Sequence, residues 1–164
     1  MEAHKCLIFD GTFLHRPVSI ITLMNGENNE VISGKYGVSE NSDTQLIAFF
    51  RPLIGEGLEP ISFTVDGNPG VIRVIKLLWP EIIVQRCLVH IQRQGLMWCR
   101  HNPKTTYARK LRDIFLQVTR IRTVDEQDRF LESVDRWEKT YGEYIQPHPE
   151  RGKVFSDIKR ARSS

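Results

Sequence analysis

Residues 61–70 read Ile61-Ser62-Phe63-Thr64-Val65-Asp66-Gly67-Asn68-Pro69-Gly70, and this stretch decides the fold that the sequence predicts. β-Branched and aromatic residues fill its first half, which favours a buried strand ending at Asp66. The Gly-Asn-Pro-Gly that follows is typical of a tight turn, and residues 71–78 then carry apolar side chains at helical spacing. The stretch therefore predicts a strand, a turn and a helix, with a carboxylate at the strand's end.

A second stretch near the start of the chain repeats this pattern. Residues 6–12 read Cys6-Leu7-Ile8-Phe9-Asp10-Gly11-Thr12, so another apolar strand ends in Asp-Gly. Between the two stretches, residues 18–24 and 30–36 predict two more strands, joined by turn residues into an antiparallel meander. A helix follows, with a capping box formed by Ser42 and Gln45, and residues 82–84 predict a last short strand. This order predicts an α/β fold with a mixed sheet flanked by helices.

The two strand ends can meet in space. A strand–helix–strand crossover places parallel strands near one another, and ligands of open α/β sheets bind at the carboxyl ends of the strands. If the two strands are parallel neighbours, Asp10 and Asp66 lie side by side. Two such carboxylates repel unless a cation neutralises them, and Mg²⁺ or Mn²⁺ prefers oxygen ligands of this kind. A metal site for phosphodiester cleavage is one interpretation; favourable turn chemistry at each Asp-Gly is the other.

Composition narrows the class of protein. The 164 residues are 40% hydrophobic and 26% charged, with a net charge of +3, which is typical of a globular chain. The three cysteines form neither a disulfide framework nor a paired Cys-x-x-Cys zinc motif. We find no secretory leader and no apolar run long enough to cross a bilayer. We therefore expect a cytoplasmic protein without membrane contact.

The second part of the chain is helical and unevenly charged. Apolar side chains recur at helical spacing over residues 107–121 and 130–144, which predicts a helical hairpin. We expect a core over residues 1–101, and a helical insertion with a basic tail over residues 102–164. Five basic residues are candidate phosphate contacts, namely Arg100, Lys104, Arg109, Lys110 and Arg112. The simpler interpretation of such a run is a solvated helix face.

Two other chemistries fit the motifs less well. Phe9-Asp10-Gly11-Thr12 resembles the Asp-x-Asp-Gly-Thr signature of haloacid-dehalogenase phosphatases, but Ile8 stands at the nucleophile's position and cannot attack a phosphate. Cys87 and His90, with Cys99 and His101, could suggest zinc, yet their spacing is irregular for a zinc site. A structural role for the thiol and the imidazole is the preferred interpretation.

These motifs together resemble the catalytic region of Mutator-type transposases of bacterial insertion sequences. The resemblance rests on Asp10-Gly11-Thr12, on Val65-Asp66-Gly67 and on the run Arg86-Cys87-Leu88-Val89-His90-Ile91. It covers most of the chain and implies a ribonuclease H-like fold with an Asp, Asp, Glu metal triad. By position, Asp10 and Asp66 match the first two ligands of Mg²⁺ or Mn²⁺, and Cys87 and His90 match the family's Cys-x-x-His pair.

The resemblance also implies what the third acid and the function should be. The family's glutamate follows the helical insertion, and none of Glu132, Glu138, Glu143 and Glu150 stands in a matching context. We therefore expect an incomplete catalytic core for cleavage of DNA and transfer of its 3′ end, with transposon ends and target DNA as partners and a homodimer as an option. The alternative is a catalytically inactive ribonuclease H-like module that binds nucleic acid or a partner.

Overall fold

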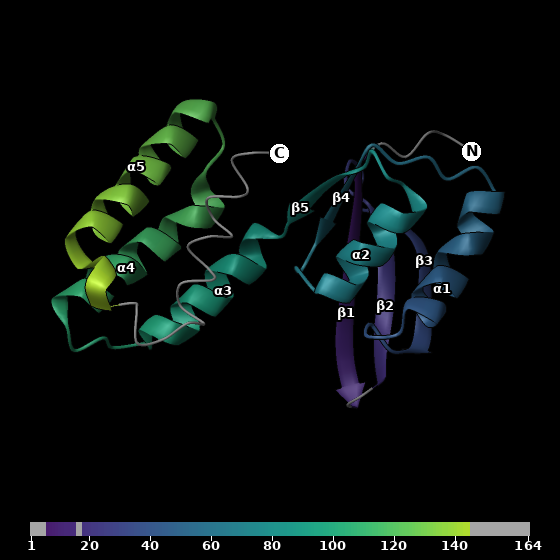
Figure 1. Ribbon diagram of the computed structural model, residues 1–164, viewed down its shortest axis with the longest axis horizontal. Helices are drawn as coiled ribbons and strands as arrows, with labels where there is room; N and C mark the ends of the chain where they lie inside the picture. The colour runs from purple at the N-terminus through teal and green to yellow at the C-terminus, as the bar shows by residue number, and fades with distance from the viewer. Residues whose placement is uncertain (1–5, 16–17, 145–164) are drawn as a thin grey trace. The chain divides into compact units, whose positions relative to one another are not determined.

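The computed structural model describes residues 6–15 and 18–144 of the chain. The chain divides between residues 87 and 88 into two compact units, which we call the sheet unit and the helical unit (Figure 1). The expected basic tail lies outside the described residues. Each unit has a separate hydrophobic core, so each is considered by itself.

The sheet unit is built on five strands in the order β3-β2-β1-β4-β5. Their bounds are β1 Cys6–His15, β2 Val18–Asn25, β3 Val31–Val38, β4 Ser62–Val65 and β5 Ile83–Arg86. The pairs β1–β2 and β2–β3 are antiparallel, whereas β1–β4 and β4–β5 are parallel. The predicted meander and the predicted parallel strands are both confirmed. The sheet is therefore mixed, with antiparallel and parallel pairs, as the sequence predicted.

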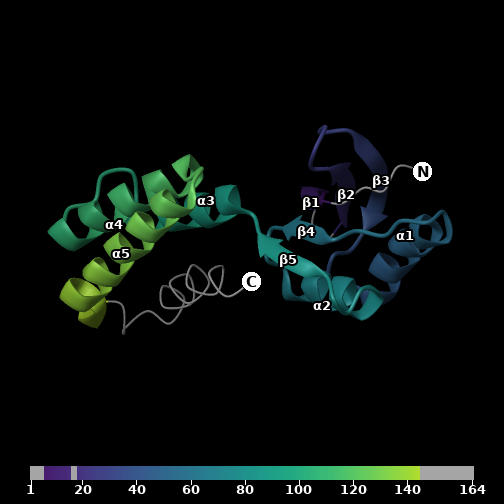
Figure 2. The same ribbon diagram turned by 90° about the horizontal axis from the view of Figure 1, so that it is seen from above.

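Two helices cover one face of this sheet, α1 (Asp43–Gly55) and α2 (Pro69–Leu78) (Figures 1 and 2). Phe50 of α1 lies at the centre of the core, with its ring centroid 5.9 Å from that of Phe63 and 5.6 Å from that of Trp79. Burying each large apolar side chain contributes roughly 1.5–3 kcal/mol before entropy is counted. Trp79 is half-buried and packs against this core.

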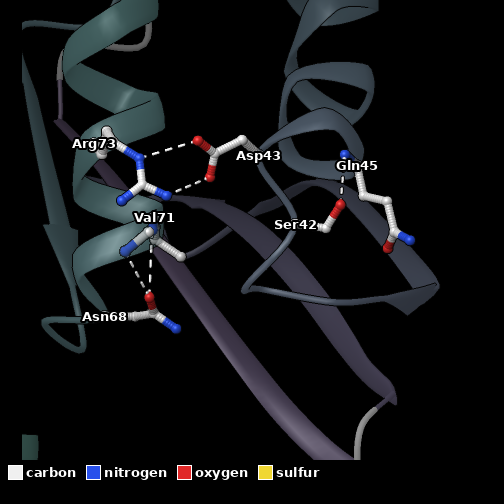
Figure 3. Close-up of polar contacts among 7 residues, drawn as sticks. Ser42, Asp43, Gln45, Asn68, Val71 and Arg73 are labelled. Atoms are coloured by element: carbon white, nitrogen blue, oxygen red, sulfur yellow. Dashed lines mark hydrogen bonds and ion pairs between the residues drawn. The ribbon is translucent and has the colours of Figure 1, made fainter.

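The start of α1 differs in one detail from the predicted capping box. The Ser42 side chain accepts from the Gln45 backbone N–H at 3.4 Å, so Ser42 is the N-cap (Figure 3). The Gln45 side chain instead accepts from the backbone N–H of Ser39 at 2.7 Å. Because Ser39 follows β3 directly, this bond ties the helix to the end of the meander.

The helical unit consists of three helices with short 3₁₀ turns after the second and the third. Their bounds are α3 Leu88–Cys99, α4 Thr106–Gln117, η1 Val118–Arg120, α5 Val124–Tyr141 and η2 Gly142–Tyr144. The Trp137 indole N–H donates to the Tyr107 carbonyl at 2.9 Å, which links α5 to α4. Thr123 and Glu126 form a complete capping box at the start of α5. The predicted hairpin of amphipathic helices is confirmed.

Gly95 explains how α3 joins this hairpin. Glycine inside a helix is ordinarily destabilising. In the structure Gly95 is buried, and the ring of Phe115 from α4 lies where a side chain at residue 95 would have to be. α3 thus belongs to the helical unit by its packing. The expected functional division, with a core over residues 1–101, stays a prediction.

Candidate metal centre

Asp10 and Asp66 lie level with one another on neighbouring parallel strands. The β1–β4 register pairs Ile8 with Thr64, and each aspartate stands two residues further along its strand direction. Adjacent strands run about 4.8 Å apart where they are paired. Pairing with β4 ends at Ile8, so β1 continues past Asp10 without a β4 neighbour beside it. Both aspartates are half-buried, at the level where β4 ends. The prediction that the first strand ends at Asp10 is wrong, because its pairing with β2 continues to His15.

The turn after Asp66 is held by hydrogen bonds from its own residues. Asp66 Oδ1 accepts from the Asn68 backbone N–H at 2.8 Å. Asn68 Oδ1 then accepts from the N–H groups of Gly70 at 2.8 Å and Val71 at 3.4 Å, which makes Asn68 the N-cap of α2 (Figure 3). Pro69 occupies the first helical turn, where its missing N–H costs nothing. The turn therefore fixes both the direction of α2 and the position of the Asp66 carboxylate.

Arg86 packs against the same turn from the end of β5. Gly67 has a φ of +98°, a conformation that favours glycine, and the Arg86 guanidinium lies where a β-carbon at residue 67 would be. The same guanidinium donates to the Asp66 carbonyl at 3.4 Å. A positive charge thus stands beside the second aspartate.

A third carboxylate near these residues was not foreseen from the sequence. Glu40 follows β3, and only 3% of its surface is exposed. Its carboxylate lies against the Cα of Gly11, in the space that a side chain at residue 11 would fill. Its backbone carbonyl lies 3.1 Å from the ideal β-carbon position of Gly70. Glu40 is therefore held between the segment after Asp10 and the segment after Asp66.

The electrostatic environment of Glu40 is unfavourable to its charge. Burial raises the pKa of this carboxyl, the negative charges of Asp66 and Asp10 raise it further, and the Ser19 hydroxyl opposes them. Oε1 is buried and has no hydrogen-bond partner among the residues that the structure describes. Because both aspartates raise the pKa of Glu40, each of them lies close enough to interact electrostatically with it.

The donor atoms of this region suit a hard divalent cation. Mg²⁺ and Mn²⁺ take oxygen ligands, and Mg²⁺ is commonly held by one or two carboxylates together with water and substrate phosphates. Within residues 6–15 and 18–144, no group of three or more His, Cys, Asp or Glu side chains is arranged to hold a metal ion. The fit therefore rests on the carboxylates of the two aspartates at the same level of neighbouring strands.

Cys87 and His90 fall on opposite sides of the division between the units. Cys87 ends the sheet unit, where it is half-buried and its backbone N–H donates to the Val65 carbonyl at 2.6 Å. That bond extends the β4–β5 pairing by one residue. His90 lies in the first turn of α3 and is half-buried in the helical unit. The supporting role of this pair stays a prediction.

The candidate phosphate contacts lie on or before α4. Arg100 follows α3 with a φ of +60°, and Lys104 precedes α4; both are exposed. On α4, Arg109 and Lys110 are exposed and Arg112 is half-buried. The Lys110 ammonium lies 5.6 Å from the centroid of the Tyr141 ring, which stabilises it over α5. The buried face of α4 holds Leu111, Ile114 and Phe115, so the basic side chains project from the rest of the helix.

Comparison with known proteins identifies a family and finds similar solved structures. The family described as "Transposase, Mutator family" matches residues 10–150, which is most of the chain. Among solved structures, the catalytic core domain of HTLV-2 integrase, in complex with magnesium and in a trimeric form, is similar at a TM-score of 0.41 and 12% identity. That similarity covers 70% of this chain and 84% of the integrase chain. No curated protein sequence matches. None of the described helices is long and apolar enough to span a bilayer.

Proposed function

Because this chain belongs to the Mutator family of transposases, we propose that its sheet unit carries the metal centre of a DDE transposase. Asp10 and Asp66 would hold Mg²⁺ or Mn²⁺ where β4 ends beside the middle of β1. The observation that carries the proposal is the parallel register of these strands, which brings the two aspartates level. Asp66 lies 56 residues after Asp10 in the sequence, and this register brings the two residues near one another.

The cation would supply two effects in phosphodiester cleavage: activation of a water or 3′-hydroxyl, and stabilisation of the leaving oxygen. The chain's own residues position these ligands. The cap at Asn68 fixes the turn that presents Asp66, and the ladder with β2 holds Asp10 in place. The reaction of the family, hydrolysis of donor DNA and transfer of its 3′ end to target DNA, is part of the proposal.

The proposal predicts that each aspartate is needed for binding the cation. Titration of the chain with Mn²⁺, followed by calorimetry, should show binding that Asp10→Asn and Asp66→Asn each weaken by at least about tenfold, because each removes one of two anionic ligands. Asp128→Asn changes an exposed aspartate of α5 and serves as the matched control. Unchanged binding in both Asp10→Asn and Asp66→Asn would show that the metal centre is elsewhere.

DNA is the proposed partner, through the basic residues on and before α4. Neutralising phosphates releases counterions, so binding should weaken steeply as salt is raised. Loss of Arg109 and Lys110 together should reduce that salt dependence in a fluorescence-anisotropy titration. A chain that binds DNA in this way but neither binds Mn²⁺ nor cleaves DNA would instead be the inactive nucleic-acid-binding module.

A further inference from the structure

Glu40 is a buried acid of the sheet unit that the proposed metal centre does not use as a ligand. Only 3% of the residue is exposed, and its Oε1 has no hydrogen-bond partner among the described residues. Leaving a buried carboxylate oxygen without a partner is costly, and proteins rarely keep one without a use. The position therefore calls for an explanation.

Two glycines show that the surrounding structure makes room for this acid. Gly11 directly follows Asp10, and the Glu40 carboxylate fills the space that any side chain at residue 11 would need. Gly70 lies four residues after Asp66, and the Glu40 carbonyl lies against it. Glu40 is thus enclosed by the two segments that present the aspartates, which fixes its charge next to both of them.

The surroundings of Glu40 oppose its charge. An ion pair of this unit joins Arg73 to Asp43 across α2 and α1, at 2.6 Å and on the surface (Figure 3). The Ser19 hydroxyl acts to lower the pKa of Glu40, but it also donates to the Val38 carbonyl at 2.7 Å. Burial and both aspartates oppose the charge of Glu40. A cation bound by Asp10 and Asp66 would offset the repulsion between Glu40 and these two aspartates.

We propose that Glu40 is a positioning residue of the metal centre, whose buried negative charge, held against Gly11, strengthens the binding of a divalent cation by Asp10 and Asp66. It acts through its electric field from behind the aspartates and is not required to touch the ion. At this range in a partly buried site, a third negative charge changes the affinity for a divalent cation by about tenfold. The inference rests on the proposed function, because it needs the aspartates to hold the cation.

The test compares cation-free and cation-bound stability in the full chain. Glu40→Gln keeps the shape of the side chain and removes its charge. We expect its melting temperature to rise without cation, and the further rise caused by saturating Mn²⁺ to be smaller than in wild type. Calorimetry should show about tenfold weaker Mn²⁺ binding. Glu59→Gln, at an exposed glutamate between α1 and β4, is the matched control and should behave as wild type.

A second variant moves the charge without deleting it. Gly11→Ala places a β-carbon where the Glu40 carboxylate lies, so the acid must leave its position. We expect weaker Mn²⁺ binding in Gly11→Ala although all three acids remain. Gly34→Ala is the control in the same sheet, since a β-carbon there meets the Ile21 carbonyl at an ordinary 3.6 Å. If Gly11→Ala does not fold, Glu40→Gln alone decides.

The outcomes separate this inference from the proposed function. If Asp10→Asn and Asp66→Asn abolish Mn²⁺ binding while Glu40→Gln retains wild-type affinity and a wild-type thermal shift, Glu40 has only a structural role and the inference is wrong. If neither aspartate variant affects binding, the metal centre itself is wrong and the inference falls with it. Weakening in all three variants supports both.

Discussion

Glu40 shows how one residue can link stability to pH at this site. Its pKa is raised by burial, by Asp66 and by Asp10, so the folded chain holds this proton more tightly than the unfolded chain does. For a carboxyl with a raised pKa in the folded state, the stabilisation by the proton is fully present below the usual value of 4.5 and is lost as pH rises through the raised value. The free energy of unfolding of the wild-type chain therefore decreases as pH rises from 4.5 through the raised pKa of Glu40.

A Glu40→Gln variant should not lose stability as pH rises through this window. We expect it to be more stable than wild type at pH 7 without cation, by on the order of 1 kcal/mol, because it buries no charge. The difference should shrink toward zero as pH falls to about 4, where wild-type Glu40 carries its proton. Urea unfolding at several pH values measures this. A stability difference that grows toward acid pH would mean that the folded state favours the charged form of Glu40.

The ion pair of Asp43 with Arg73 works in the opposite direction. The Arg73 guanidinium lowers the pKa of the Asp43 carboxyl, so its contribution is present above the usual value of 3.8 and is lost as pH falls. Both side chains are exposed, and such pairs contribute little to stability. The pair joins α1 to α2, and its pH dependence has the opposite sign to that of Glu40.

Among the elements, α3 contains a glycine, Gly95, at a position where helix propensity alone would favour alanine. Alanine is favoured over glycine inside a helix by about 1 kcal/mol. Gly95, however, is buried against the ring of Phe115, and a β-carbon there would overlap the ring. Overpacking of this kind costs about 1–3 kcal/mol because the neighbouring ring and backbone must shift.

We therefore expect Gly95→Ala to destabilise the chain, with the cost of overpacking exceeding the gain in helix propensity. Gln94→Ala changes the exposed neighbour on the same helix and should alter stability by less than about 0.5 kcal/mol. Urea unfolding followed by far-ultraviolet circular dichroism measures both variants. A Gly95→Ala chain that is more stable than wild type would show that α3 and α4 do not pack as described.

The strands and helices were largely predictable, since each depends on local patterns. The apolar runs before Asp10 and Asp66 predicted β1 and β4, although β1 continues to His15. The crossover rule allowed β1 and β4 to be parallel neighbours but did not decide that they are. Asn68 and Pro69 predicted the start of α2 from turn chemistry. These features depend on residues close together in the chain, which is why the sequence carries them.

Glu40 could not be predicted in this way. In the sequence it stands among Ser39, Asn41 and Ser42, where a glutamate is ordinarily exposed in a loop. Its burial depends on the contacts that the segment after β3 makes with Gly11 of β1 and Gly70 of α2. No local sequence pattern predicts these contacts. Gly11 held the available signal: a glycine in mid-strand indicates close approach of another group. Only the structure identifies Glu40 as the group that approaches Gly11.

At the scale of the whole molecule, the two units have separate cores and carry different parts of the proposal. In the sheet unit, Glu40 follows the meander, Asp10 lies on the first strand of the meander, and Asp66 follows β4. The helical unit carries the basic residues of α4. The proposed metal centre and the proposed phosphate contacts thus belong to different units of one chain.

The most direct measurement is the position of Mn²⁺ in crystals of the full chain, located by its anomalous scattering. The account predicts a peak at coordination distance from carboxylate oxygens of both Asp10 and Asp66, and loss of that peak in Asp10→Asn. No peak at saturating Mn²⁺, or a peak that touches neither aspartate, would contradict it.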